Sequence, residues 1–142
     1  MDYDQLAREW LHKMRLLRQA RLQRSINASM HGESFVLHFI TRHPGPVLPS
    51  DLSHAMGVSS AMVAATLNRL EGKGFITRQI DPFDRRRVLV EITKEGNNQA
   101  ELHHQTVLAE AGKMLSLLGD DDAREYVRLT GKLADIIAGH SE

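Results

Sequence analysis

The fold is decided by the stretch PSDLSHAMGVSSAMV, residues 49–63, which predicts two short helices joined at a glycine. The first of these helices is expected to bury Leu52, Ala55 and Met56. Gly57 can adopt the left-handed backbone conformation that ends a helix, because it has no Cβ. The chain is therefore expected to turn sharply at Gly57 and to start a second helix soon afterwards.

The second helix is expected to begin after Ser59, whose side chain can accept hydrogen bonds from the free amide groups of a first helical turn. It runs to about Lys73, and Gly74 is its stop signal. Its apolar stripe follows the helical period at Val63, Leu67 and Leu70. Two short helices that cross at a glycine turn form a helix-turn-helix, whose second helix fits the major groove of DNA.

After Gly74 the apolar residues repeat every second position, which predicts two strands over residues 76–80 and 88–92. Asp81-Pro82 favours a turn between them, and three consecutive arginines, Arg85 to Arg87, make the tip basic. A helix-turn-helix followed directly by a basic hairpin is a winged helix. One element is placed to contact base edges, and the other to grip phosphates or the minor groove.

Composition is compatible with DNA binding although the 142-residue chain carries no net charge. Residues 1–49 have seven Lys/Arg against four Asp/Glu, residues 50–96 seven against six, and residues 97–142 four against eight. The acidic groups thus gather away from the predicted DNA elements. The length predicts one compact subunit, and the sequence shows no membrane span and no signal peptide. The chain has no cysteine, which excludes thiol chemistry and fits a cytoplasmic protein.

Long amphipathic helices are expected on both sides of the winged segment. They are predicted over residues 3–27, 32–43, 94–118 and from Asp120 almost to the end. These helices carry more apolar surface than a small domain can cover, so we expect a second copy of the chain to cover it. The predicted fold is therefore mainly α with a small β-hairpin wing. A winged helix-turn-helix at residues 49–96 is embedded in a helical dimerisation scaffold formed by residues 1–48 and 97–142.

The residues also bear on two other classes of function, a metal-responsive regulator and an enzyme. A metal-responsive regulator is suggested by His31, His38, Glu101 and His104, because Glu101 and His104 are three apart and share a helix face. The adjacent His103 and His104 point about 100° apart, which disfavours their binding one ion. An enzyme is not predicted, since the sequence has no phosphate-binding glycine loop, no His-Glu-x-x-His pair and no nucleophile elbow. No cofactor is predicted either.

The chain resembles the MarR family of bacterial transcription regulators, and two motifs carry the resemblance. The family's wing pattern, Asp-x-Arg-Asp-x-Arg, a strand and Leu-Thr-x-x-Gly, is matched at Asp81, Asp84, Arg86, Thr93 and Gly96. Its helix-to-strand pattern is matched at Leu70, Glu71, Gly74, Phe75, Ile76 and Arg78. The chain departs from these patterns with Ile92 in place of leucine, Phe83 in place of the first wing arginine, and Gly72 where a charged residue is common.

The resemblance implies a homodimer, joined through its first and last helices, that binds a pseudo-palindromic operator on double-stranded DNA, usually as a repressor. It also implies a small effector, often an aromatic or phenolic acid, that loosens DNA binding from a cleft between the dimer helices and the winged domain. By residue match, Asp84 and Arg86 take the wing-tip roles, with Arg86 directed at the minor groove.

The expected DNA interface consists of the exposed face of the second helix and the wing tip. Alanine methyl groups there can touch thymine methyl groups, and Asn68 can pair with adenine or a phosphate. Because the helix offers no arginine near its N-terminus, DNA shape and the wing are expected to carry much of the specificity. The predicted interface residues are Ser59, Ser60, Ala61, Ala64, Asn68, Arg69, Asp84, Arg85 and Arg86.

Overall fold

The structure, a computed structural model, describes residues 1–29 and 32–140, apart from the side chain of Leu22. Helices dominate it, and one antiparallel hairpin accompanies them, as predicted. In chain order the elements are α1 (Tyr3–Gln19), α2 (Arg21–Ser29), α3 (Gly32–Arg42), α4 (Pro49–Met56), α5 (Ser60–Gly72), β1 (Ile76–Ile80), β2 (Val88–Ile92), α6 (Lys94–Ser116) and α7 (Asp120–Gly139).

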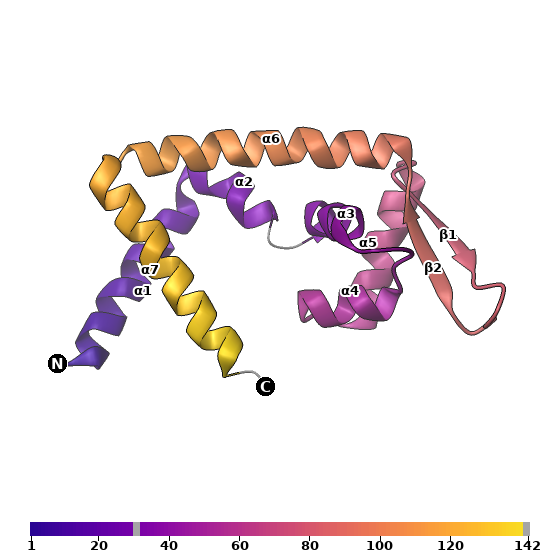
Figure 1. Cartoon of the computed structure of the whole chain (residues 1–142), viewed down its shortest axis with the longest axis horizontal. Coiled ribbons are helices and arrows are strands. Elements are labelled where there is room, and N and C mark those ends of the chain that lie inside the picture. The colour runs from indigo at the N-terminus through magenta and orange to yellow at the C-terminus, as the bar shows by residue number, and fades with distance from the viewer. Residues whose placement is uncertain (30–31, 141–142) are drawn as a thin grey trace.

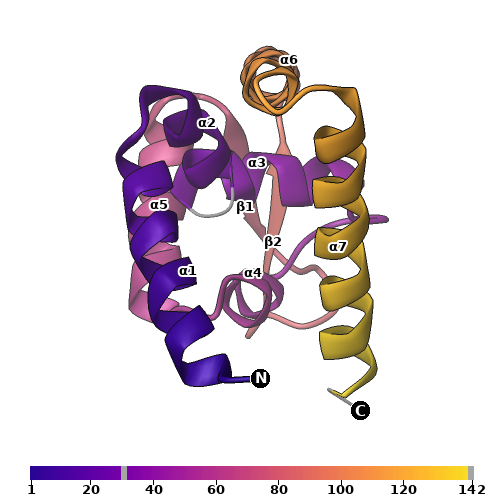
Figure 2. The ribbon, with the colours of Figure 1, turned by 90° about the vertical axis from the view of Figure 1, so that its left-hand side faces the viewer.

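The long helix α6 connects two groups of elements (Figure 1). At one end lie α3, α4, α5 and the β1–β2 hairpin. At the other end, α7 runs from α6 to the C-terminus, and α1 runs between α2 and the N-terminus. After a 90° turn about the vertical axis, α1 and α7 are seen as two helices that lie apart from each other (Figure 2). The winged segment and the terminal helices are thus held apart, and α6 is the continuous element between them.

The helix-turn-helix forms as its local signals predict. Gly57 ends α4 in the left-handed conformation at φ 64°, and its N–H donates to the Ser53 carbonyl at 3.0 Å. Ser59 caps α5, because its hydroxyl accepts from the Met62 N–H at 3.2 Å. One prediction for α4 is wrong. Leu52 is buried and Met56 partly so, but Ala55 is exposed. The partly buried Ser53 and Met56 lie on one side of Leu52 around the helix axis, and Ala55 lies on the other side.

A single hydrophobic core joins α3, the helix-turn-helix, the hairpin and the start of α6. Four α5 side chains are buried. One of them is the polar Thr66, whose hydroxyl is satisfied by donating to the Met62 carbonyl at 3.0 Å. Three core residues come from α3, so the core extends across the predicted boundary at residue 48. The buried hydrophobic residues are Val36, Leu37, Ile40, Val47, Leu52, Val63, Leu67, Leu70, Ile76, Val90 and Ala100.

The hairpin pairs in a register that runs from Ile76 opposite Ile92 to Ile80 opposite Val88. Thr93 then ties it to α6. Its hydroxyl donates to the Gly74 carbonyl at 2.6 Å and accepts from the Gly96 N–H at 3.0 Å, which caps α6. Gly96 is needed because a Cβ there would overlap the Phe75 carbonyl oxygen. The Thr-x-x-Gly motif therefore sets how the wing meets α6.

The N-terminal helix predicted over residues 3–27 is wrong in one respect. The chain breaks between α1 and α2 at Ala20, which is extended with φ −67° and ψ 138°. No proline or glycine marks this position, and alanine favours a helix. The break turns the chain so that α2 packs against α6 while α1 points away from it. Tertiary packing therefore overrides local propensity at this residue.

The terminal helices α1 and α7 bury no residue in the isolated chain. Large apolar side chains of both remain in solvent, including Trp10 at 57% and Ile137 at 58% exposure. None of the helices that the structure describes has the length and apolar character required to cross a membrane.

Candidate nucleic-acid interface

The exposed face of α5 carries small side chains and almost no charge. Successive residues on an α-helix turn by about 100°, which places Ala61, Ala65 and Asn68 opposite the buried stripe of this helix. These residues are exposed, as are Ser60 and Ala64 beside them. The helix therefore presents methyl groups and one amide, with its backbone free to approach a partner closely.

Asn68, the one amide on this face, is fixed by a residue of the neighbouring strand. Nη2 of Arg78 donates to Oδ1 of Asn68 at 2.6 Å. The same guanidinium grips the Glu71 carboxylate with two bonds, from Nε at 3.1 Å and from Nη2 at 3.2 Å. Hydrogen bonding from Arg78 lowers the pKa of Glu71, which keeps the carboxylate charged. Asn68 thus belongs to a three-residue network that joins α5 to β1.

Arg69 lies on a different side of α5 from Asn68 and meets α3. Its Nε donates to Glu33 at 3.0 Å, and its Nη2 donates to the Thr66 hydroxyl at 3.2 Å. Lys73 also reaches Glu33, at 2.7 Å. These two cations lower the pKa of Glu33, with the Lys73 hydrogen bond the largest cause. Arg69 therefore joins α5 to α3, a role that differs from the DNA contact predicted from the sequence.

Two aspartates close the wing tip by capping its backbone. Asp81 is buried, and its Oδ1 accepts from the Phe83 N–H at 2.8 Å. Asp84 accepts from the Arg86 N–H at 3.0 Å. Side chains that hydrogen-bond the backbone two residues onward stabilise tight turns. The two aspartates of the wing motif therefore shape the tip from which the arginines project.

The three wing arginines differ in their solvent exposure and in their ion pairs. Arg87 lies 3.8 Å from the Asp81 carboxylate and is half-exposed. Arg86 is 93% exposed and approaches Asp84 at 3.4 Å. Arg85 is exposed, and no ion pair involves it within residues 1–29 and 32–140. Phe83 stands beside them at 97% exposure. Arg85 and Arg86 are accordingly the side chains best placed to meet a polyanion.

The predicted interface residues fall into two groups. Ser60, Ala61, Ala64 and Asn68 share the outer face of α5, and Arg85 and Arg86 project from the wing. The other three have structural roles. Ser59 caps α5, Arg69 joins α5 to α3, and Asp84 stabilises the turn at the wing tip. Arg78 and Glu71 were not predicted from the sequence as partners of Asn68. The sequence did carry a signal for these two residues, because both belong to the helix-to-strand motif.

The histidines that suggested a metal site lie between α3 and α6. The His38 and His104 rings stack at 5.5 Å, and Glu101 accepts from the Gln105 amide at 2.7 Å. In the part of the chain that the structure describes, no group of three or more potential ligands could hold a metal ion. His31 lies outside that part. The metal-responsive alternative stays a prediction.

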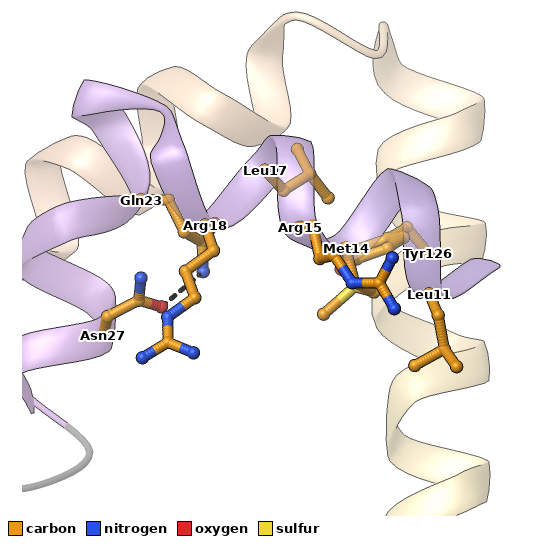
Figure 3. Close-up of a pocket in the computed structure, with 8 residues that line it drawn as sticks. All are labelled: Leu11, Met14, Arg15, Leu17, Arg18, Gln23, Asn27 and Tyr126. Carbon is orange, nitrogen blue, oxygen red and sulfur yellow. Dashed lines mark hydrogen bonds between the residues drawn. The ribbon is translucent and has the colours of Figure 1, made fainter. Parts of the chain in front are cut away.

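Several cavities lie away from the α5–wing surface, and two of them are each lined by residues of three helices. One, of about 250 Å³, lies between α3 and α6 and is lined by Ser29, Ser34, His38, Ala100, His103, His104 and Val107. The other, of about 290 Å³, lies where α1 and α2 meet α7 (Figure 3) and is lined by Leu11, Met14, Arg15, Leu17, Arg18, Gln23, Asn27 and Tyr126. The Gln23 amide donates to Asn27 there at 3.2 Å.

A helix-turn-helix with an exposed helix face, followed by a hairpin that projects arginines, defines the class of winged-helix DNA-binding proteins. The MarR family profile matches residues 31–88. The chain is 25% identical to YwhA of Bacillus subtilis, an uncharacterised HTH-type transcriptional regulator, over 94% of this chain and 99% of YwhA. It is 39% identical over 51 residues to the regulator YcgE of the same organism, a match that spans 36% of this chain and 33% of YcgE.

Solved structures share the architecture over nearly the whole chain. The transcriptional repressor CouR, solved bound to a 23-mer DNA duplex, matches with a TM-score of 0.68 at 22% identity, over 87% of this chain and 89% of CouR. Residues 31–88 thus carry the MarR family domain, and the chain is a winged-helix transcriptional regulator. That family consists of regulators rather than enzymes.

Proposed function

We propose that the protein is a homodimeric repressor that binds a pseudo-palindromic operator through α5 and the wing, in the cytoplasm. The observation that carries the proposal is the pairing of an uncharged, exposed α5 face with the exposed arginines at the wing tip. Small side chains let a helix sit deep in the major groove, and arginine is suited to a narrow minor groove. CouR, which has the same fold, was solved on a DNA duplex.

The dimer is proposed from the terminal helices. They leave apolar side chains in solvent along their lengths, and monomeric proteins rarely expose such continuous patches. Contact between two copies of the same patch produces a closed two-fold dimer. Two α5 helices related by that axis would then meet two half-sites of the operator. The exposed apolar residues of these helices are Tyr3, Leu6, Trp10, Leu11, Met14, Leu16, Leu17, Tyr126, Val127, Leu129, Leu133, Ile136 and Ile137.

Binding of a small aromatic or phenolic acid is proposed at the cavity between α3 and α6. This position couples it to DNA binding, because α3 packs on α5 and α6 continues toward the terminal helices. Nε2 of His103 is buried there without a hydrogen-bond partner in the described part of the chain. An acidic ligand would supply that partner, and its ring would lie against Ala100 and Val107, the apolar residues of the lining.

The proposed function is tested by electrophoretic mobility shift with the DNA upstream of the protein's own gene. We expect a shifted complex of two chains per operator that unrelated DNA does not compete away. Light scattering should give the mass of a dimer without DNA. A complex that unrelated DNA competes equally, or a monomer in solution, would contradict the proposal. Adding 4-hydroxybenzoate should release the DNA, whereas cyclohexanecarboxylate, which is not aromatic, should release less.

A further inference from the structure

We propose that Arg78 is a positioning residue that decides which base Asn68 recognises, by holding the amide oxygen of Asn68 away from the DNA. The inference rests on the proposed function, because it requires the outer face of α5 to lie in the major groove. It goes beyond it by naming a base preference and the residue that sets it.

The orientation of the Asn68 amide follows from the chemistry of its partner. A guanidinium carries only hydrogen-bond donors, so the Asn68 atom that lies 2.6 Å from Nη2 of Arg78 must be the oxygen. Hydrogen bonds from a charged donor are shorter and stronger than neutral ones. The amino group of Asn68 is then the end that remains free to meet a ligand of α5.

Arg78 is itself held in place, so the orientation is built into the structure before DNA binds. Its two bonds to Glu71 form a fork, and Glu71 lies one helical turn after Asn68 on α5. The side chain of Arg78 is only 28% exposed. For Asn68 to turn its oxygen outward, it would have to break a charge-assisted bond to a guanidinium that the Glu71 carboxylate anchors.

The consequence is a change in base preference. A free asparagine pairs with adenine through both amide ends, because adenine offers one acceptor, N7, and one donor, the N6 amino group. An asparagine that presents only its amino group is suited instead to an edge with acceptors alone. Guanine offers two acceptors, N7 and O6, in the major groove. We therefore expect Asn68 to prefer guanine over adenine at one position of each half-site.

The test is a binding selection from a DNA library in which the operator half-site is randomised. The wild type should enrich guanine over adenine at one position in each half-site. In the double variant Glu71→Gln/Arg78→Met, which leaves the net charge unchanged, the preference at that position should move toward adenine by roughly tenfold, as expected for a gained bidentate pair. Preferences at the other positions should stay as they were.

Two further variants separate positioning from other roles. In an Asn68→Ala background, Glu71→Gln/Arg78→Met should change nothing more at that position, because the residue through which Arg78 acts is gone. Arg78→Lys keeps a donor near Asn68 and should restore part of the guanine preference. Each variant must melt and dimerise like the wild type before its selection is interpreted.

The outcomes are distinguishable. An unchanged base preference in Glu71→Gln/Arg78→Met would overturn the inference, and so would the same change in the Asn68→Ala background, since Arg78 would then contact the base itself. If the wild type enriches no sequence, the proposed function fails, and the inference fails with it. If the wild type enriches a half-site in which Asn68→Ala alters no position, only the inference fails.

Discussion

Replacing Arg86 by alanine should weaken operator binding while leaving the fold intact. Its side chain is 93% exposed, and the one ion pair that it makes with the described residues is the 3.4 Å approach to Asp84. Exposed pairs of this kind contribute about 0–1 kcal/mol to stability. Loss of a DNA contact is larger, about 1–3 kcal/mol per site. Arg86→Ala should therefore reduce affinity far more than it reduces the free energy of unfolding.

The salt dependence of binding gives a second, independent measure of the same change. Each phosphate neutralised by a protein cation contributes about −0.9 to the slope of log affinity against log salt concentration. A dimer that loses one contact in each subunit should thus lose about two units of slope. Fluorescence anisotropy of a labelled operator over a range of salt concentrations measures both quantities.

The matched control is Lys113→Ala, which removes the same charge near the end of α6 that lies farthest from the wing. It should leave affinity and slope nearly unchanged. The reasoning is refuted if Arg86→Ala binds with the wild-type slope, or if Lys113→Ala lowers the slope equally. The second result would mean that total charge, rather than the wing, determines binding.

Four other predictions follow from single features of the structure. Gly96→Ala should lower the free energy of unfolding by about 1–3 kcal/mol in urea titrations, because the new methyl group meets the Phe75 carbonyl, whereas Gly112→Ala, which meets open space, should not. Phe83→Arg restores the family's first wing arginine on a fully solvated side chain, and should steepen the salt slope by about one unit per subunit; an unchanged slope would show that residue 83 stays away from the phosphates. Deleting residues 120–142 should expose the apolar stripe of α1 and yield monomer or aggregate in light scattering, and a well-behaved truncated dimer would contradict the proposed interface. Desolvation first, and then the charge of Arg42 and the nearby His104 and His103, hold the pKa of His38 below its ordinary value. The unfolded chain therefore binds a proton at His38 more readily than the folded chain does. The contribution of His38 to stability should be fully present above about pH 6.5 and should fall as the pH drops below that value. His38→Gln should flatten the plot of unfolding free energy against pH in this range.

The sequence by itself determined the winged helix-turn-helix. Its signals are local: Gly57 supplies a left-handed turn, Ser59 and Thr93 supply helix caps, and the period of the apolar residues changes from helical to alternating after Gly74. Each of these depends on the conformation of a few neighbouring residues, so each can be recognised without knowing what the chain packs against.

Only the tertiary structure decided the features that depend on distant neighbours. Ala20 has a helical preference that the packing of α2 on α6 overrides, so no local signal marks the break. The roles of Arg69 and Asn68 likewise depend on partners 36 residues before and 10 residues after them, Glu33 and Arg78. A sequence shows that a side chain can bind DNA. Whether it is free to do so, and with which of its atoms, is settled by the charged groups that folding brings within hydrogen-bonding distance.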